Sequence, residues 1–237
     1  VEIHRAVLHQ GLGQVLAGLL GSAVTAGYGA EIVQYDRYTE NREAIANSIA
    51  ERDGLAVIPA YDHYEVMAGQ GTAAMELVEE VKSLDALIVP ISGGGLIAGA
   101  AVATQALCPS AEIFGVEPLA GNDMKLSFDA GKRIAISVPR TIADGLQVSI
   151  PGELTFPIIQ RAVRDVLLVT DEAIVAAMHL IFERVKLVVE PSGATTLAAL
   201  LAHRDQFRGK RVGLLLSGGN IGVDRFVDLT RSLRSTP

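Results

Sequence analysis

The sequence predicts an α/β fold with a twisted, mostly parallel sheet and flanking helices. Short runs rich in Val, Ile and Leu alternate with longer amphipathic stretches from about residue 31 to the end, a pattern typical of parallel sheets. Two of the apolar runs, 86–91 and 211–216, lead directly into a Ser-Gly-Gly turn. A chain of 237 residues can bury roughly 70–75% of its unfolded surface without disulfides or structural metals.

Each element has a local signal. Strands are predicted at the short apolar runs 31–35, 56–59, 86–91, 112–116, 166–169 and 211–216. Helices are predicted at the amphipathic stretches 40–51, 64–82, 96–107, 123–130, 172–186, 191–203 and 224–233. Asp171 and Glu172 mark one helix start, and Pro191 marks another because its missing N–H group leaves no helical bond unmade. Residues 133–151 have no sustained period and are predicted to be a long loop, which is usually functional or disordered.

Composition and charge narrow the class of protein. The formal net charge is -7 and the basic residues are scattered, so we expect no nucleic-acid partner. No run approaches the ~18 apolar residues of a membrane span, so no membrane partner is expected. Cys108 is the single cysteine and cannot form an internal disulfide, which favours a structural thiol in a reducing compartment. We therefore expect a cytoplasmic protein.

Three predicted strands end in unusual residues. They are followed by the turns SGGG at 92–95 and SGGN at 217–220 and by Glu117. In a parallel sheet these ends share one edge, where ligands bind. The first turn can hold a phosphate because glycines let the backbone approach a ligand, although a tight strand-to-helix turn needs the same small residues. Ser217 can contact a ligand or, more commonly, cap the next helix.

Glu117 and Asp123 flank a turn that ends in Gly121 and Asn122. Two carboxylates and a backbone carbonyl can bind a hard divalent cation. The residues alone favour the alternative, in which Glu117 is a strand-end residue and Asp123 caps the helix that follows. The five histidines show no HxxxH or HxH spacing, so a zinc site is not supported.

A dinucleotide site is an alternative. Residues 93–98 fit the pattern GxGxxA after a strand, and Glu117 closes the next strand at the distance expected of a ribose-binding acid. This would make the chain a Rossmann-type NAD(P)-binding oxidoreductase. The pattern occurs in the middle of the chain, however, and does not explain the second Ser-Gly-Gly turn.

Taken together, the motifs resemble the threonine/serine dehydratase and serine racemase family, which are fold type II pyridoxal-phosphate enzymes. The similar segments follow the family's order, at 28–32, 68–72, 92–96, 116–118, 141–145, 190–194 and 217–220. The resemblance extends from about residue 27 to 222. Each motif is weak alone, but the set is specific.

The resemblance implies a role for each matching residue. The cofactor phosphate would bind the backbone of Ser92, Gly93, Gly94, Gly95 and Leu96. Ser217 would bond the pyridine nitrogen, with Gly145 and Glu190 near the ring. Glu117, the Gly121 carbonyl and Asp123 match the family's divalent-cation site, for Mg or Ca. With this resemblance, a cation site is preferred over a strand-end Glu117 and a capping Asp123. The substrate would be a small amino acid, and we expect a homo-oligomer, namely a dimer.

The sequence departs from the family near its start. The family's Schiff-base lysine lies in a Ser-Phe-Lys segment that is absent from these residues, as is a Ser-Gly-Asn-His element. We therefore expect an N-terminally truncated member, with residues 1–83 holding a remnant of the small domain and residues 84–237 an incomplete cofactor-binding domain. The parent reaction would be deamination of L-threonine or L-serine to a 2-oxo acid and ammonia, with racemisation as a second activity. The chain alone would be inactive, and a non-catalytic remnant or partner protein is a further alternative.

Overall fold

The computed structural model describes residues 6–7 and 26–231. The chain divides into two compact units, Pro59–Gly219 and a second one drawn from Val1–Ile58 and Asn220–Pro237. All of the predicted site residues belong to the unit Pro59–Gly219. The two predicted domains, 1–83 and 84–237, refer to the family's small and large domains and stay a prediction.

A four-stranded parallel sheet forms the centre of the unit Pro59–Gly219. Its strands lie in the order β5 (Asp165–Val169), β4 (Glu112–Pro118), β3 (Ala86–Pro90) and β6 (Val212–Leu214). Residues 86–89 of β3 have no exposed surface. A strand buried on both faces needs apolar side chains throughout, which is why its sequence ALIVP shows no polar alternation.

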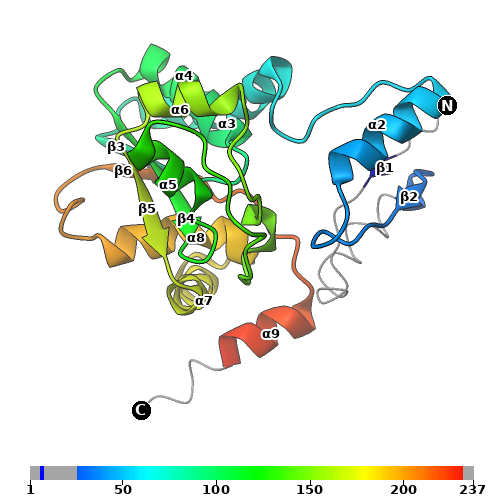
Figure 1. Cartoon of the computed structure of the whole chain (residues 1–237). Helices are drawn as coiled ribbons and strands as arrows, with labels where there is room; N and C mark the ends of the chain where they lie inside the picture. Colours follow the sequence, from blue (N-terminus) through cyan, green and yellow to red (C-terminus); the bar gives the residue numbers. More distant parts are fainter. Residues whose placement is uncertain (1–5, 8–25, 232–237) are drawn as a thin grey trace. The chain divides into compact units, whose positions relative to one another are not determined.

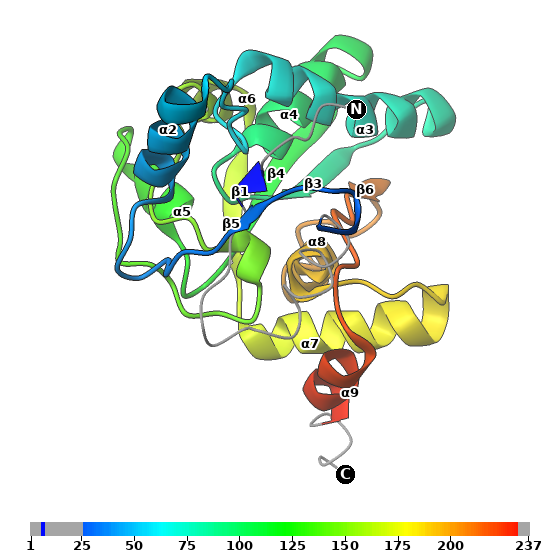
Figure 2. The same ribbon diagram turned by 90° about the vertical axis from the view of Figure 1, so that its right-hand side faces the viewer.

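Helices cover both faces of this sheet (Figures 1 and 2). One face carries α3 (Tyr64–Val81), α4 (Gly95–Leu107) and α6 (Thr155–Ala162). The other carries α7 (Asp171–Leu180) and α8 (Pro191–Ala202), with α8 packed on β3, β4 and β5. The short helix α5 (Asp123–Ala130) packs beside β5. These layers confirm the predicted α/β class.

Two glycines let α3 and α4 approach each other closely. A Cβ atom added to Gly99 would lie 2.0 Å from the carbonyl oxygen of Met67, and one added to Gly71 would lie 2.8 Å from that of Gly99. Real Cβ atoms do not approach backbone oxygens so closely, so larger residues would force the helices apart. The motif AGQGT at 68–72 therefore has a packing role through Gly71.

The second unit contains the parallel pair β1 (Ala6–Val7) and β2 (Ile32–Val33) and the helices α2 (Arg42–Asp53) and α9 (Val223–Arg231). Asn41 caps α2 by accepting a hydrogen bond from the Ala44 N–H group, and Gly54 ends it with a φ of 67°. Within residues 26–231, no helix is long and apolar enough to cross a membrane.

Several predicted elements differ from the structure. Residues 56–59 are not a strand: Ile58 is 83% exposed and Pro59 has no N–H group to donate. The helix predicted at 172–186 changes to a π-helix at Ile181–Val185. Within the loop at 133–151, Asp144–Leu146 form one 3-10 turn. The sequence reasoning missed α6 altogether.

The close crossing predicts opposite effects for two glycine substitutions. Gly99→Ala is expected to lower the free energy of unfolding by about 1–3 kcal/mol, because its Cβ overlaps the Met67 carbonyl. Gly69→Ala is the matched control, since a Cβ there meets nothing within 4 Å and alanine favours a helix by roughly 0.5–1 kcal/mol. Urea unfolding measures both. Equal midpoints for the two variants would contradict this account of the crossing.

Candidate cofactor and cation site

The parallel register brings the three predicted turns to one edge of the sheet. Pro90 of β3 pairs with Val116 of β4, and Ile88 pairs with Leu214 of β6. The turn at 92–95 therefore leaves the sheet between Glu117 and the turn at 217–219. Neighbouring strands lie about 4.8 Å apart, so one small ligand can contact turns from adjacent strands.

The first turn presents a row of free N–H groups. The helix α4 begins at Gly95, and Gly94 precedes it with a φ of 98°, which glycine adopts without strain. Within residues 26–231, no group of the protein accepts a hydrogen bond from the N–H groups of residues 92–97. Most of these residues are buried. Buried N–H groups are almost always paired, and the positive end of a helix attracts anions, so this turn fits a phosphate.

The predicted ring-contacting residues gather around the N-terminus of α8. The Glu190 N–H group donates to the Gly218 carbonyl over 3.1 Å. The Gly145 N–H group donates to Ser192 Oγ over 3.0 Å. A Cβ atom on Gly193 would lie 2.7 Å from the Gly218 oxygen. The structure thus brings Gly145, Glu190 and the Ser217 turn together, although they are far apart in sequence.

Ser217 is exposed and does not cap a helix. The next helix along the chain, α9, begins only at Val223, too far away for Ser217 to be its N-cap. The predicted alternative role of Ser217 is therefore wrong. Its side chain is exposed at the edge of the sheet, next to the turn that begins at Ser92.

Glu117 is buried and stabilises the start of α5. Only 1% of its surface is exposed, and its carboxylate accepts hydrogen bonds from the N–H groups of Met124 (3.2 Å) and Lys125 (2.9 Å). Glu117 thus takes the capping role that the alternative interpretation gave to Asp123. Asp123 is the first residue of the helix, and Asn122 precedes it without a side-chain bond.

Asp123 is buried as well and lies close enough to Glu117 to affect its charge. Its surface is 1% exposed, and its Oδ2 atom has no hydrogen-bond partner in the part of the chain that the structure describes. Burial raises the pKa of Asp123 to about 7. Burial and the neighbouring Asp123 charge raise the pKa of Glu117 well above its ordinary value, although the two hydrogen bonds from backbone N–H groups act to lower it.

This acidic bend fits a hard divalent cation. A buried carboxylate oxygen without a donor, beside a second buried carboxylate, is the environment that a cation with oxygen ligands stabilises. The loop at 133–151 covers the bend, since a Cβ on Gly121 would lie 3.1 Å from Pro139 Cγ and 3.3 Å from the Leu146 oxygen. Within the described residues, no group of three or more His, Cys, Asp or Glu side chains could hold a metal. Further oxygen ligands for a cation at this bend would have to come from backbone carbonyls or water.

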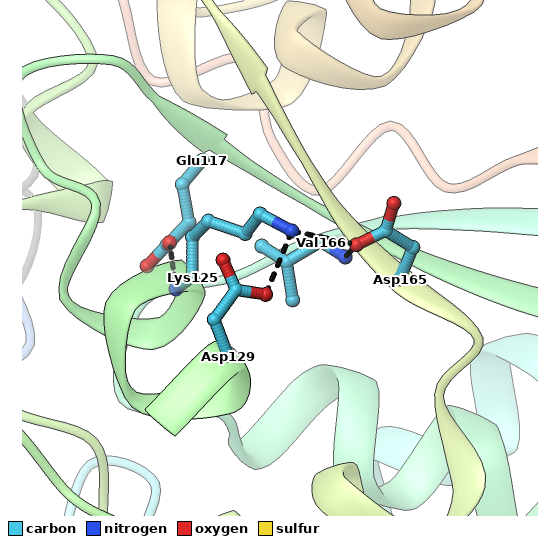
Figure 3. A network of polar contacts seen from close by, with 5 residues as sticks. All are labelled: Glu117, Lys125, Asp129, Asp165 and Val166. Carbon is cyan, nitrogen blue, oxygen red and sulfur yellow. Dashed lines mark hydrogen bonds and ion pairs between the residues drawn. The ribbon is translucent and has the colours of Figure 1, made fainter. Parts of the chain in front are cut away.

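A salt-bridge network holds α5 on β5 (Figure 3). The Lys125 ammonium contacts Asp129 and Asp165 at 2.9 Å each, and Asp165 also accepts a bond from the Val166 N–H group. Lys125 is thus engaged away from the turns. Lys82 and Lys210 precede β3 and β6, so they lie toward the opposite edge of the sheet.

The sequence reasoning missed three polar residues near the site. Asp62 accepts bonds from N–H groups at the start of α6, Thr155 donates to the Gly93 carbonyl, and Asp171 anchors the loop through Thr141 and the Ile142 N–H group. Asp62 lies about ninety residues from its partners. No local pattern could identify it, because its role depends on the tertiary fold.

Comparison with known proteins matches the same region of the chain. Residues 23–218 match a family described as pyridoxal-phosphate dependent enzyme. The L-threo-3-hydroxyaspartate ammonia-lyase of Saccharomyces cerevisiae is 49% identical over 221 residues, which are 93% of this chain and 68% of that protein. The serine racemase of Schizosaccharomyces pombe is 48% identical over 204 residues, 86% of this chain and 63% of that protein.

Solved structures agree with this match. Maize serine racemase is 37% identical with a TM-score of 0.82, covering 92% of this chain and 67% of the other. The T.th. threonine deaminase is 42% identical with a TM-score of 0.79, covering 85% of this chain and 67% of the other. The chain thus spans about two thirds of the length of these relatives.

The dinucleotide alternative does not hold. Glu117 is buried and bonded to α5, so it cannot present its carboxylate to a ribose. The family match, the sequence relatives and the parallel sheet agree: the chain belongs to the pyridoxal-phosphate-dependent enzymes, with the fold type II architecture.

Proposed function

We propose that this chain provides the phosphate, ring and cation sites of a pyridoxal-phosphate-dependent enzyme that acts on a 3-hydroxy amino acid. The observation that carries the proposal is the row of N–H groups at residues 92–97, which have no acceptor in the described part of the chain and lie next to the Ser217 turn on the adjacent strand. The first supplies a phosphate site and the second a polar group for a heterocycle.

Each part of the cofactor has a candidate partner. Ser92, Gly93, Gly94, Gly95 and Leu96 would hold the phosphate through their backbone. Ser217 would bond the ring nitrogen, with Gly145 and Glu190 nearby. When bound, pyridoxal phosphate supplies an electron-accepting ring that stabilises negative charge on the substrate's α-carbon. A neutral hydroxyl at Ser217 would leave the ring nitrogen largely unprotonated and moderate that effect.

The relatives narrow the substrate class. The two proteins named above are an L-threo-3-hydroxyaspartate ammonia-lyase and a serine racemase, and a similar structure is a threonine deaminase. Hydroxyaspartate, serine and threonine all carry a hydroxyl group on the β-carbon. The parent reaction would remove ammonia from such an amino acid and leave a 2-oxo acid, with racemisation as a second activity.

The amine that the reaction needs is not provided by the described turns. Lys125 is held by two carboxylates, and Lys82 and Lys210 lie toward the opposite edge of the sheet. The other two lysines, Lys132 and Lys186, are exposed just beyond α5 and the π-helix. Without an amine to bind the cofactor covalently and move the α-proton, elimination lacks its central acid and base. We propose that these 237 residues bind the cofactor but do not turn over substrate by themselves.

The acidic bend supports a cation site. Glu117, the Gly121 carbonyl and Asp123 would bind Mg²⁺ or Ca²⁺, with water completing the coordination shell. A dication would neutralise two carboxylates that otherwise repel each other in a buried place. Its role would be to stabilise the bend and the loop that covers Gly121.

The cofactor site predicts binding without turnover. The purified chain is expected to bind pyridoxal phosphate, followed by absorbance or fluorescence titration, and to release no ammonia from hydroxyaspartate, serine or threonine above the buffer rate. Ser217→Ala should weaken binding about three- to tenfold, the loss of roughly one hydrogen bond. Ser110→Ala, an exposed serine beyond the opposite edge of the sheet, is the control. Binding of NAD(P) in place of pyridoxal phosphate would contradict the proposal.

The cation site predicts a thermal shift. Added Mg²⁺ or Ca²⁺ should raise the Tm of the chain at pH 8, measured by calorimetry, by several degrees at concentrations well above Kd. Asp123→Asn should abolish most of this shift because it removes a ligand charge. Asp129→Asn, on the same helix but more exposed, should keep it. An equal response in all three chains would show that the bend is not the binding site.

The raised pKa values predict the pH dependence of stability without cations. Folded Asp123 keeps its proton up to a pKa of about 7, whereas an unfolded aspartate loses it near about 4. The free energy of unfolding should therefore fall between these values as the pH rises, by up to about 1.4 kcal/mol per pH unit for this group. Urea unfolding from pH 4 to 8 measures it, with Asp123→Asn as reference. A wild-type curve parallel to that of the variant would be inconsistent with the raised pKa.

A further inference from the structure

Polar groups outside the glycine turn hold its backbone in place. The Asp62 carboxylate accepts hydrogen bonds from the N–H groups of Glu153 (2.8 Å), Leu154 (2.9 Å) and Thr155 (3.2 Å), at the start of α6. A Cβ atom on Gly152 would lie 2.4 Å from Asp62 Oδ1. The carboxylate thus fixes the position of Thr155 with charge-assisted bonds.

Thr155 in turn binds the glycine turn. Its side chain is fully buried, and Oγ1 donates to the Gly93 carbonyl over 2.6 Å. The Gly152 N–H group donates to the same oxygen over 3.2 Å. On the other side of the turn, the Tyr61 ring occupies the space of a Gly93 side chain, since a Cβ there would lie 2.2 Å from the ring. The turn is therefore held on two sides.

The two bonds to the Gly93 carbonyl set the direction of the next N–H group. In a planar trans peptide the C=O and N–H groups point in opposite directions. Because the Gly93 oxygen points toward Thr155 and Gly152, the Gly94 N–H group must point away from them. That N–H group belongs to the row at residues 92–97 that has no acceptor among residues 26–231.

We propose that Asp62 and Thr155 are positioning residues for the phosphate: Thr155 fixes the Gly93–Gly94 peptide plane so that the Gly94 N–H group faces the bound phosphate, and Asp62 holds Thr155 in place. The inference rests on the proposed cofactor site. It adds two residues that contact neither ring nor phosphate and act only through the backbone of the turn.

The test compares ligands with and without a phosphate group. Dissociation constants of the full chain are measured for pyridoxal phosphate, pyridoxal and inorganic phosphate by titration, together with the ³¹P NMR shift of bound pyridoxal phosphate. Thr155→Val keeps the shape of the side chain but removes the donor. It should weaken pyridoxal phosphate and inorganic phosphate about five- to tenfold, the scale of one hydrogen bond, and change the ³¹P shift, while pyridoxal binding changes less than twofold.

Three further variants control for structural effects. Thr155→Ser restores the donor and should restore the preference for the phosphate ligand. Asp62→Asn keeps Thr155 but should reduce the preference for pyridoxal phosphate over pyridoxal about threefold. It replaces Thr155→Val as the test variant if Thr155→Val does not fold. Thr104→Val is the matched control, because Thr104 is fully buried in α4 and its Oγ1 has no partner among the described residues. It should leave all three constants unchanged.

The outcomes separate this inference from the proposed function. A wild-type chain that binds none of the three ligands overturns both. The second outcome is that the wild-type chain binds pyridoxal phosphate and that Thr155→Val and Asp62→Asn keep the wild-type ratio of pyridoxal to pyridoxal phosphate affinity. This result overturns the positioning role alone. The positioning role would also be overturned if Thr155→Val and Thr104→Val weakened the binding of pyridoxal phosphate and of pyridoxal equally, because that pattern indicates a general loss of fold stability.

Discussion

Parallel hydrogen bonding of β3 with β4 and with β6 decides where each candidate group lies. The register makes the strands end at the same edge, so residues at 92, 117 and 217 become neighbours. A slip of one residue would also turn the apolar side chains of each strand to the other face. The register thus brings the glycine turn at 92–95, the acidic bend at Glu117 and Asp123, and the serine turn at 217–219 to one edge.

The groups at this edge are held in costly arrangements that a ligand would relieve. Two features reduce the stability of the unliganded chain: N–H groups at the start of α4 without an acceptor in the described residues, and two neighbouring buried carboxylates at the start of α5. One site is electropositive and the other electronegative, and they follow adjacent strands. This separation of charge fits a phosphate-bearing cofactor at the electropositive start of α4 and a cation at the neighbouring carboxylates.

Local signals account for much of the fold and point to the candidate site residues, but they do not reveal which residues hold them in place. The helix at 123–130 and the starts at Asp171 and Pro191 could be predicted because their signals lie within a few residues. The helix α6 could not, since its capping carboxylate is Asp62, far away in sequence. The strand predicted at 56–59 failed because an apolar run does not reveal whether a partner strand is available. Burial of Glu117 and Asp123, which favours a cation over a simple cap, is likewise a property of the packed structure.

We infer that the turns at 92–97 and 217–219, with Gly145, form one site for pyridoxal phosphate. The most direct measurement is a series of ¹H–¹⁵N NMR spectra of the chain titrated with this ligand. We expect saturable shifts that are largest at the amides of residues 92–97, with smaller shifts at Gly145 and at 217–219. Shifts confined to other parts of the chain, or present at only one of the two turns, would contradict it.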